Sequence, residues 1–251
     1  MIKESLSKLS PLETFNKEAF IGDHEYGQDL CNFVLALSLI WNDTKNIMLF
    51  YEYLKDLKPK DIEFSDPNAM PIMPIWGEIS GIKFYLEKSL IALIHELFSL
   101  IRNSKDVLES NSFKTIYKQL RRNCRESWDT IISFASGGAD SKTPLGKALL
   151  MVRHKITNHY DKNEIFKGYK KKFLLESSIP YISRGNRMLE ERFYFADAAA
   201  QEYYRSQLEK VTSEEFHKNI NLIKNSINLA LQNLIETFIQ GRSAWKQVKN
   251  G

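Results

Sequence analysis

Apolar residues recur at spacings of three and four along most of the chain, which is the period of an amphipathic α-helix. In the first long segment seven positions follow this spacing: Leu30, Phe33, Val34, Leu37, Ile40, Trp41 and Thr44. The pattern predicts a helix over about 27–57. It ends ahead of Pro59, because the residue before a proline disfavours helical backbone.

Prolines interrupt the pattern after this helix. Four of the seven prolines fall within 58–76, so this stretch is not continuous helix. It is too apolar for a free linker and predicts an ordered crossover loop. The next run, about 78–103, is apolar around much of its circumference, which is typical of a central helix.

The remaining elements are also predicted to be helical. Expected helices cover about 110–135, 144–160, 163–175, 188–210 and a last helix from Thr212. Thr143 is a plausible N-cap with Pro144 as first helical residue, and Thr212 with Glu215 resembles a capping box. Asn158, Tyr160 and Asp161 are compatible with the end of the 144–160 helix.

No set of alternating strands is visible, so the predicted class is all-α, an elongated helical bundle of about six to eight helices. Two parts are expected, packed as one unit. Residues 1–76 would form an N-terminal helical extension with the Pro-rich crossover loop. Residues 77–251 would form the main bundle.

Composition narrows the class of protein. The chain has 251 residues, 43% of them hydrophobic and 26% charged, which is ordinary for a soluble globular protein. The N-terminus lacks the apolar core of a signal peptide. The most apolar stretch, 90–101, contains His95 and Glu96 and is too short for a membrane span. We expect a cytoplasmic protein without membrane contact.

Metal and cofactor motifs are not visible. Cys31 and Cys124 lie far apart and are expected as buried free thiols. His95 beside Glu96 suggests a satisfied core histidine more than a metal pair, because adjacent residues on a helix do not converge. His24 and His217 are expected on the surface. We expect neither metal nor cofactor.

Positive charge is concentrated in one segment. The whole chain carries a net charge of +4, whereas residues 142–172 contain nine Lys and Arg against Asp161 and Glu164, a net +7. The rest of the chain therefore sums to −3. Such a segment suits an anionic partner, most commonly nucleic acid, although a solvated helix face is an equal alternative.

The run MVRHKITNHYD at 151–161 places Arg153, His154 and His159 in this basic segment. Cleavage of RNA by its 2′-hydroxyl needs a proton removed from that hydroxyl and a proton given to the leaving 5′-oxygen. Histidine can perform either transfer near neutral pH. An arginine can hold two phosphate oxygens and stabilise the charge that develops. No metal is required for this chemistry.

Helix geometry limits what one chain can do. Arg153 and His159 are six residues apart, which on a regular helix separates them by about 120° and roughly 9 Å along the axis. They would not touch on one straight helix. Both could border a groove made with a second helix, or approach each other if the helix breaks near His159.

These residues resemble the motif of the HEPN superfamily (higher eukaryotes and prokaryotes nucleotide-binding domains), an Arg, four to six residues, then His near the end of a bundle helix. Arg153 matches the Arg, His154 the polar neighbour and His159 the His, and the HYD ending is similar to HEPN proteins of abortive-infection and toxin–antitoxin systems. About 20 residues carry the resemblance. The first 76 residues have no match in the family's minimal core.

The resemblance implies a metal-independent endoribonuclease that acts as a homodimer, with paired motifs lining one cleft and a 2′,3′-cyclic phosphate product. Arg153, His154 and His159 would be catalytic. Residues assigned to RNA contact are Lys155, Asn158, Tyr160, Lys118, Arg121, Arg122 and Arg125. RNA, a second copy of the chain and an antitoxin or defence-system partner are the expected partners.

Two further patterns have alternative interpretations. Lys114, Lys118, Arg121 and Arg125 would share one stripe of a 110–135 helix, to follow an RNA backbone or to face solvent. The aromatic stretch 191–205, with nearby Tyr181, favours core packing over base stacking.

A catalytically silent helical module that binds RNA or a protein remains the alternative function. On that interpretation Arg153 and His159 are surface residues that favour a helix C-terminus.

Overall fold

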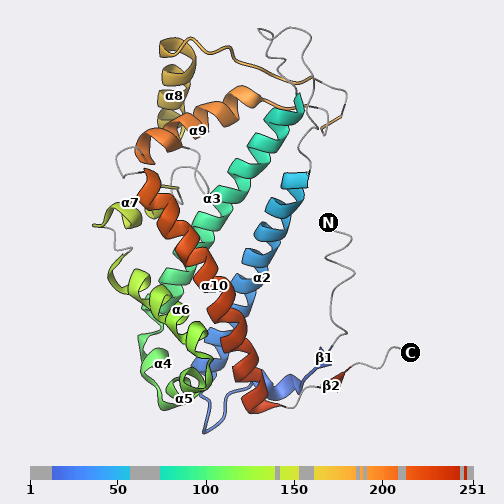
Figure 1. Cartoon of the computed structure of the whole chain (residues 1–251), viewed down its shortest axis with the longest axis vertical. Helices are drawn as coiled ribbons and strands as arrows, with labels where there is room; N and C mark the ends of the chain where they lie inside the picture. Colours follow the sequence, from blue (N-terminus) through green and yellow to red (C-terminus); the bar gives the residue numbers. More distant parts are fainter. Residues whose placement is uncertain are drawn as a thin grey trace. The chain divides into compact units, whose positions relative to one another are not determined.

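The computed structural model confirms the all-α class. It describes residues 13–56, 74–138, 142–152, 161–184, 187–188, 191–208, 213–243 and 246–247. Within these residues there are nine α-helices, more than the six to eight expected, because one predicted helix is divided and the short helix Lys105–Glu109 was not predicted. The only strands among them are β1 (Glu13–Thr14) and β2 (Lys246–Gln247), an antiparallel pair of two residues each (Figure 1).

The two longest predicted helices of the N-terminal half are present. α2 covers Gln28–Asp56, within a residue of the predicted bounds. α3 covers Pro74–Asn103. It starts four residues before the expected position, so the predicted loop 58–76 is wrong for its last three residues. Proline is well tolerated in the first turn of a helix, where its missing N–H has no partner to lose. The rest of that loop lies outside the described residues.

The chain separates into two compact units that are interleaved in the sequence. The first comprises Ile47–Ala92 and Ala148–Phe216, and the second Ile2–Asn46, Leu93–Lys147 and His217–Gly251. Because α2 and α3 each contribute residues to both, the units are not consecutive pieces of chain. The predicted division at residue 76 stays a prediction.

The second unit contains the short helices of the chain's middle. These are α4 (Lys105–Glu109), α5 (Asn111–Gln119) and α6 (Arg122–Ser133), followed by the short π-helix η2 (Phe134–Gly138). Its core includes three rings, Phe33 from α2, Phe113 from α5 and Trp128 from α6, with centroids 5.7 to 6.4 Å apart. Burial of such rings supplies much of the stability of a small core.

The last helix, α10 (Ser213–Arg242), buries a continuous apolar stripe. Ile223, Ile227, Leu231 and Leu234 are fully buried. Near its end, in the second unit, Arg242 ion-pairs with Asp23 at 3.2 Å and lies 4.9 Å above the ring of Tyr26. The predicted capping residue Thr212 lies outside the described residues.

The first unit contains the last residues of α7 (Pro144–Met151). It also contains α8 (Lys162–Tyr169), the π-helix η4 (Lys170–Leu175) and α9 (Tyr194–Leu208). α8 with η4 agrees with the helix predicted over 163–175. α9 starts six residues later than predicted, because Ser183 and Arg192 form an isolated backbone bridge instead. No described helix is long and apolar enough to cross a membrane.

Candidate functional site

α7 (Pro144–Met151) leads into the predicted catalytic motif, and it begins as predicted. The Thr143 hydroxyl accepts a hydrogen bond from the backbone N–H of Gly146 at 3.1 Å, which makes Thr143 the N-cap. Leu149 and Val152 are buried, so the helix is anchored in the core immediately before the motif.

On the other side of the motif, Asp161 starts a new element. Its backbone is extended, with φ −70° and ψ 104°, and its carboxylate accepts hydrogen bonds from the N–H groups of Asn163 and Glu164 at 3.1 and 3.3 Å. Asp161 is therefore the N-cap of α8, and the chain is no longer helical at this residue. This agrees with a motif helix that was predicted to end at about 160.

The motif itself lies at 153–160, outside the described residues. That range contains every predicted catalytic residue and three of the predicted RNA contacts, namely Arg153, His154, Lys155, Asn158, His159 and Tyr160. Their assigned roles stay predictions.

Directly after the motif, α8 packs very closely against α9. Gly168 is buried, and a side-chain carbon at this position would collide with the carbonyl oxygen of Ala199 and the backbone nitrogen of Tyr203. Glycine is required here because the two backbones approach too closely for any side chain. On the same helix, Tyr169 contacts the rings of Phe173 and Phe195 at centroid distances of 4.9 and 6.4 Å.

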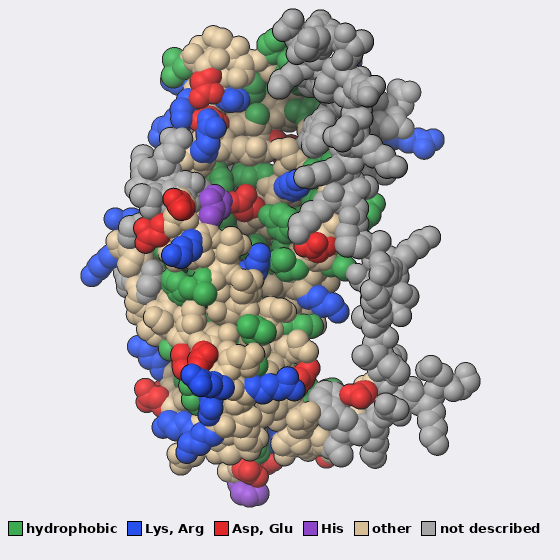
Figure 2. All heavy atoms as spheres, viewed as in Figure 1, with side chains coloured by type: hydrophobic (Ala, Val, Ile, Leu, Met, Phe, Trp, Pro, Cys, Tyr) green, Lys and Arg blue, Asp and Glu red, His purple; other side chains and the backbone are tan. Residues whose placement is uncertain are grey.

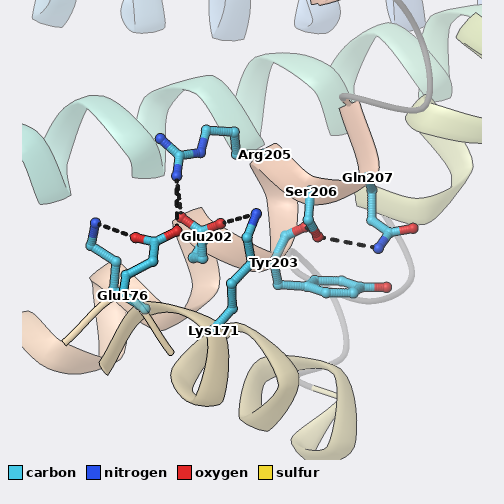
Figure 3. Close-up of polar contacts among 8 residues, drawn as sticks. Lys171, Glu176, Glu202, Tyr203, Arg205, Ser206 and Gln207 are labelled. Carbon is cyan, nitrogen blue, oxygen red and sulfur yellow. Dashed lines mark hydrogen bonds and ion pairs between the residues drawn. The ribbon is translucent and has the colours of Figure 1, made fainter. Parts of the chain in front are cut away.

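A buried carboxylate joins these helices (Figure 3). The Glu202 side chain on α9 is only 3% exposed. Lys171 of η4 approaches its Oε1 at 2.7 Å, and Nη2 of Arg205 donates to its Oε2 at 2.6 Å. Two cations on one carboxylate offset the cost of burying it. Glu202 was not among the residues singled out from the sequence, although its place beside Ala199 and Tyr203 on one helix face indicates burial.

Around Glu202 the other charges are also paired. Lys172 lies 3.1 Å from Glu176, and this hydrogen bond holds the pKa of Glu176 below its usual value. Lys167 lies 2.9 Å from Glu164 and lowers the pKa of that carboxyl in the same way. Burial, together with the neighbouring Glu164, raises the pKa of Tyr203 to about 12.

These ion pairs neutralise part of the positive charge of the basic segment 142–172. Three of its lysines are engaged by carboxylates: Lys167, Lys171 and Lys172. Glu176 and Glu202 lie outside the segment in sequence, so the net charge of +7 did not include them. On the face shown in Figure 2, basic and acidic side chains of the described residues are intermixed.

The second predicted basic stripe is altered by a helix break. The expected helix 110–135 is two helices, because Leu120 and Arg121 have extended backbone with ψ of 147° and 149°. Leu120 is buried at the break, and the N–H of Arg121 donates to Asn233 Oδ1 on α10 at 3.2 Å. Tertiary contacts thus replace the helical hydrogen bond. The prediction of one straight stripe was wrong.

The side chains of this region nonetheless reach solvent. Lys114, Lys118, Arg121 and Arg122 are exposed, and Arg125 is partly exposed. Arg122 pairs with Glu126 at 2.8 Å, with both side chains more than 60% exposed. Such exposed pairs contribute little to stability and leave the cations available to a partner.

The two cysteines and the histidines outside the motif have the burial or exposure that the sequence predicted. Cys31 and Cys124 are buried free thiols. The His95 side chain is 14% exposed, mostly buried as expected, with Nδ1 3.9 Å from Glu96. His24 and His217 are exposed. Among the described residues, no three His, Cys, Asp or Glu side chains are grouped as a metal ion would need.

Comparison with known proteins adds no relative: no protein-family model, curated protein or solved structure matches this chain. The resemblance to the HEPN superfamily therefore depends on the motif residues alone.

Proposed function

We propose that the protein is a HEPN-type, metal-independent endoribonuclease. The observation that carries the proposal is the spacing of Arg153, His154 and His159 within a run that ends in His-Tyr-Asp. Two described features support it. α7 begins with the predicted cap at Thr143, and Asp161 is non-helical, which agrees with a motif at the end of a helix.

In the proposed reaction the 2′-hydroxyl of RNA loses its proton to a histidine and attacks the adjacent phosphorus. The bond from phosphorus to the 5′-oxygen breaks, and that oxygen receives a proton. The products are a 2′,3′-cyclic phosphate and a free 5′-hydroxyl. Arg153 holds the phosphate oxygens while negative charge increases, His159 is the general acid or base, and His154 assists.

One chain supplies only half of this arrangement in our proposal. Two proton transfers at opposite sides of the phosphorus are best served by two histidines. Arg153 and His159 point about 120° apart on a regular helix. A second copy of the chain would complete the cleft, so we propose a homodimer. A cytoplasmic role in phage defence or a toxin–antitoxin pair is part of the same proposal and follows from the resemblance alone.

The test compares single variants in a cleavage assay with fluorescent RNA in excess EDTA. We expect His159→Ala to slow cleavage by about 10²–10⁴-fold, the usual contribution of a positioned acid–base group. Arg153→Ala should slow it by about 10²–10³-fold, the usual effect of removing one group that stabilises the transition-state charge. His24→Ala, which removes an exposed histidine elsewhere, should cleave as the wild type does. Circular dichroism should show the same helix content in all three.

Mass analysis of the product ends adds a second criterion, since the mechanism requires a cyclic phosphate. Unchanged cleavage by the His159→Ala protein would overturn the assignment. Light scattering of the active enzyme should give a dimer, and an active monomer would overturn the shared cleft.

A silent RNA-binding module is the second candidate, because the exposed cations Lys118, Arg121 and Arg122 suit a polyanion without any catalytic group. It predicts salt-sensitive RNA binding and no cleavage. Cleavage that disappears in the Arg153→Ala variant excludes it.

A further inference from the structure

A groove with aromatic walls lies in the first unit, and the proposed mechanism does not use it. Its volume is about 500 Å³, and it is formed by the end of η4, the following loop and the start of α9. The residues that matter for its chemistry are Lys172, Ser177, Ser178, Tyr181 and Phe195. Together they combine flat apolar surfaces with hydroxyl groups and one ammonium group.

The loop that carries Tyr181 is held in place by backbone and ionic contacts. The carbonyl of Tyr181 accepts a hydrogen bond from the N–H of Phe195 at 3.2 Å. Ser183 and Arg192 exchange two backbone hydrogen bonds of 2.8 and 3.1 Å. The groove is therefore built before any ligand arrives, which lowers the entropic cost of binding.

Arg192 strengthens this attachment. Its guanidinium pairs with Glu78 of α3 and Asp197 of α9, each at 2.8 Å. The base of the loop is thereby tied to two helices of the same unit.

The aromatic residues of this region fall into two groups. Tyr203 and Tyr204 are 6% exposed and belong to the core, as core packing predicted. In contrast, Tyr181 is 36% exposed and Phe193 54% exposed, and Phe195 is partly exposed where it lines the groove. Of these two groups, the second reaches solvent, so a ligand can contact it.

The polar groups of the groove stand at the end of η4. Ser177 has a φ of 55°, a left-handed conformation that closes the helix, and the N–H of Ser178 donates to the carbonyl of Lys172 at 3.2 Å. This turn presents both serines at the groove. Serine hydroxyls both donate and accept hydrogen bonds, so they can pair with either kind of group on a base edge.

One positive charge lies at the groove. Lys172 lines it, and its pair with Glu176 has both side chains about one third exposed, so a phosphate can compete for the ammonium group. Lys170, Arg184 and Arg187 are exposed nearby in the sequence. A ligand with a flat ring and a negative charge fits this surface better than a purely apolar peptide does.

We propose that this groove binds one unstacked base of single-stranded RNA, with Tyr181 and Phe195 on its faces, the two serines at its edge and Lys172 near the adjoining phosphate. The inference rests on the proposed function for the identity of the nucleic acid as RNA. It adds that the substrate is single-stranded at the bound position, because a paired base is not free to enter.

The test measures binding separately from cleavage. The probe is a fluorescent single-stranded 2′-O-methyl oligonucleotide of about eight nucleotides, within the usual site size. It has no free 2′-hydroxyl and cannot be cleaved by the proposed mechanism. We expect fluorescence anisotropy to show binding at low salt, weaker binding of a fully abasic strand of equal length, and weaker binding of the duplex.

Tyr181→Leu removes the ring and keeps the bulk. It should weaken binding by about 5- to 100-fold, the range for the loss of one stacked base. Tyr181→Phe should restore binding, because the ring carries the effect. Tyr85→Leu is the matched control, since Tyr85 is 62% exposed on α3 and does not line the groove. It should bind as the wild type does.

Equal binding of the abasic strand, tight binding of the duplex, or unchanged binding by Tyr181→Leu would each overturn the inference, as would the absence of any binding. Binding with the expected Tyr181 dependence but no cleavage of ordinary RNA would support the groove and overturn the proposed ribonuclease. Cleavage of ordinary RNA by the Tyr181→Leu protein with an unchanged KM would support the proposed ribonuclease and overturn the groove.

Discussion

Two regions of the chain contain a run of basic residues, and the structure uses them differently. In the α5–α6 region the cations reach solvent, and Arg122 is paired with Glu126, which is also exposed. In the α8–α9 region, Lys171 and Arg205 converge on Glu202, a carboxylate that is almost completely buried. Lys171 and Arg205 are therefore committed to the fold, whereas the exposed cations of the α5–α6 region stay available to a partner.

The cause of the difference is the separation of the helices. At Gly168 the backbones of α8 and α9 approach so closely that no side chain fits between them, which brings Lys171 within reach of Glu202. At Leu120 the chain instead bends between α5 and α6, and the neighbouring cations turn outward. A basic run in a sequence thus predicts a binding surface only where no buried acid is opposite to it.

The largest effect is expected from Gly168→Ala. The added methyl group would meet backbone atoms of Ala199 and Tyr203, which cannot move as a side chain could. We expect the free energy of unfolding to fall by about 3 kcal/mol, the upper part of the range for overpacking. Urea titration followed by circular dichroism measures this change.

Gly137→Ala is the matched control in the other region, because nothing lies within 4 Å of the added carbon. It should leave the stability unchanged or raise it by up to about 1 kcal/mol through lower entropy of the unfolded chain. Equal stability of the two variants would contradict the close approach at Gly168.

A smaller effect is expected from Glu202→Gln, which keeps the shape and removes the charge. Loss of one partner from a buried ion pair costs about 3–5 kcal/mol, but Lys171 and Arg205 are 37% and 57% exposed and can turn to water. We therefore expect a loss of about 2 kcal/mol in urea unfolding. Glu126→Gln, which breaks an exposed pair in the α6 region, should cost less than about 0.5 kcal/mol.

Raising the pH above 10 should lower stability to a different extent through the tyrosines of the two regions. In the folded protein the pKa of Tyr203 is raised from 10.0 to about 12, chiefly by burial. The stabilising contribution is complete below pH 10. Between pH 10 and 12 the unfolded chain loses the tyrosine proton while the folded chain keeps it, so stability falls as pH rises. At about 1.4 kcal/mol per pKa unit, the shift of two units corresponds to about 2.7 kcal/mol. Solvent screening of the neighbouring Glu164 lowers the expected loss to about 2 kcal/mol.

Tyr203→Phe should make this decline shallower, as measured by urea unfolding at a series of pH values from 9 to about 12. Tyr117 on α5 donates its hydroxyl to both carboxylate oxygens of Asp129 at 2.8 Å, and its pKa is also raised by burial. It lies nearer to solvent, so Tyr117→Phe should change the decline less. An equal change for Tyr203→Phe and Tyr117→Phe would contradict the expected difference in burial between the two tyrosines.

Helix periodicity predicted most of the fold. The bounds of α2 agree within one residue, and the Thr143 cap and the helix after Asp161 were found where the sequence placed them. These features depend on local chemistry, namely apolar spacing, capping oxygens and proline, which a sequence shows directly.

Two of the errors occurred where a distant residue decides the local structure. The break at Leu120 is stabilised from α10 by Asn233, which is 112 positions away from Arg121. The neutralisation of Lys171 depends on Glu202. Neither partner can be identified from spacing along the chain. Charge counts over a segment therefore overestimate the local field whenever folding adds acids from elsewhere.

The smallest effect on stability is expected from the double variant Arg121→Gln, Arg122→Gln. Both side chains are exposed, so unfolding should change by less than about 0.5 kcal/mol. If these cations contact RNA phosphates, the salt dependence of binding to a single strand should weaken by about 1.4 in logarithmic slope, because each phosphate without its cation lowers the slope by about 0.7.

Lys171→Gln should show the opposite result, with a loss of stability and an unchanged slope, because its ammonium is already held by Glu202. Fluorescence anisotropy at several salt concentrations measures the slope. A Lys171→Gln protein that keeps its stability but loses salt dependence would show that Lys171, too, is available to the nucleic acid.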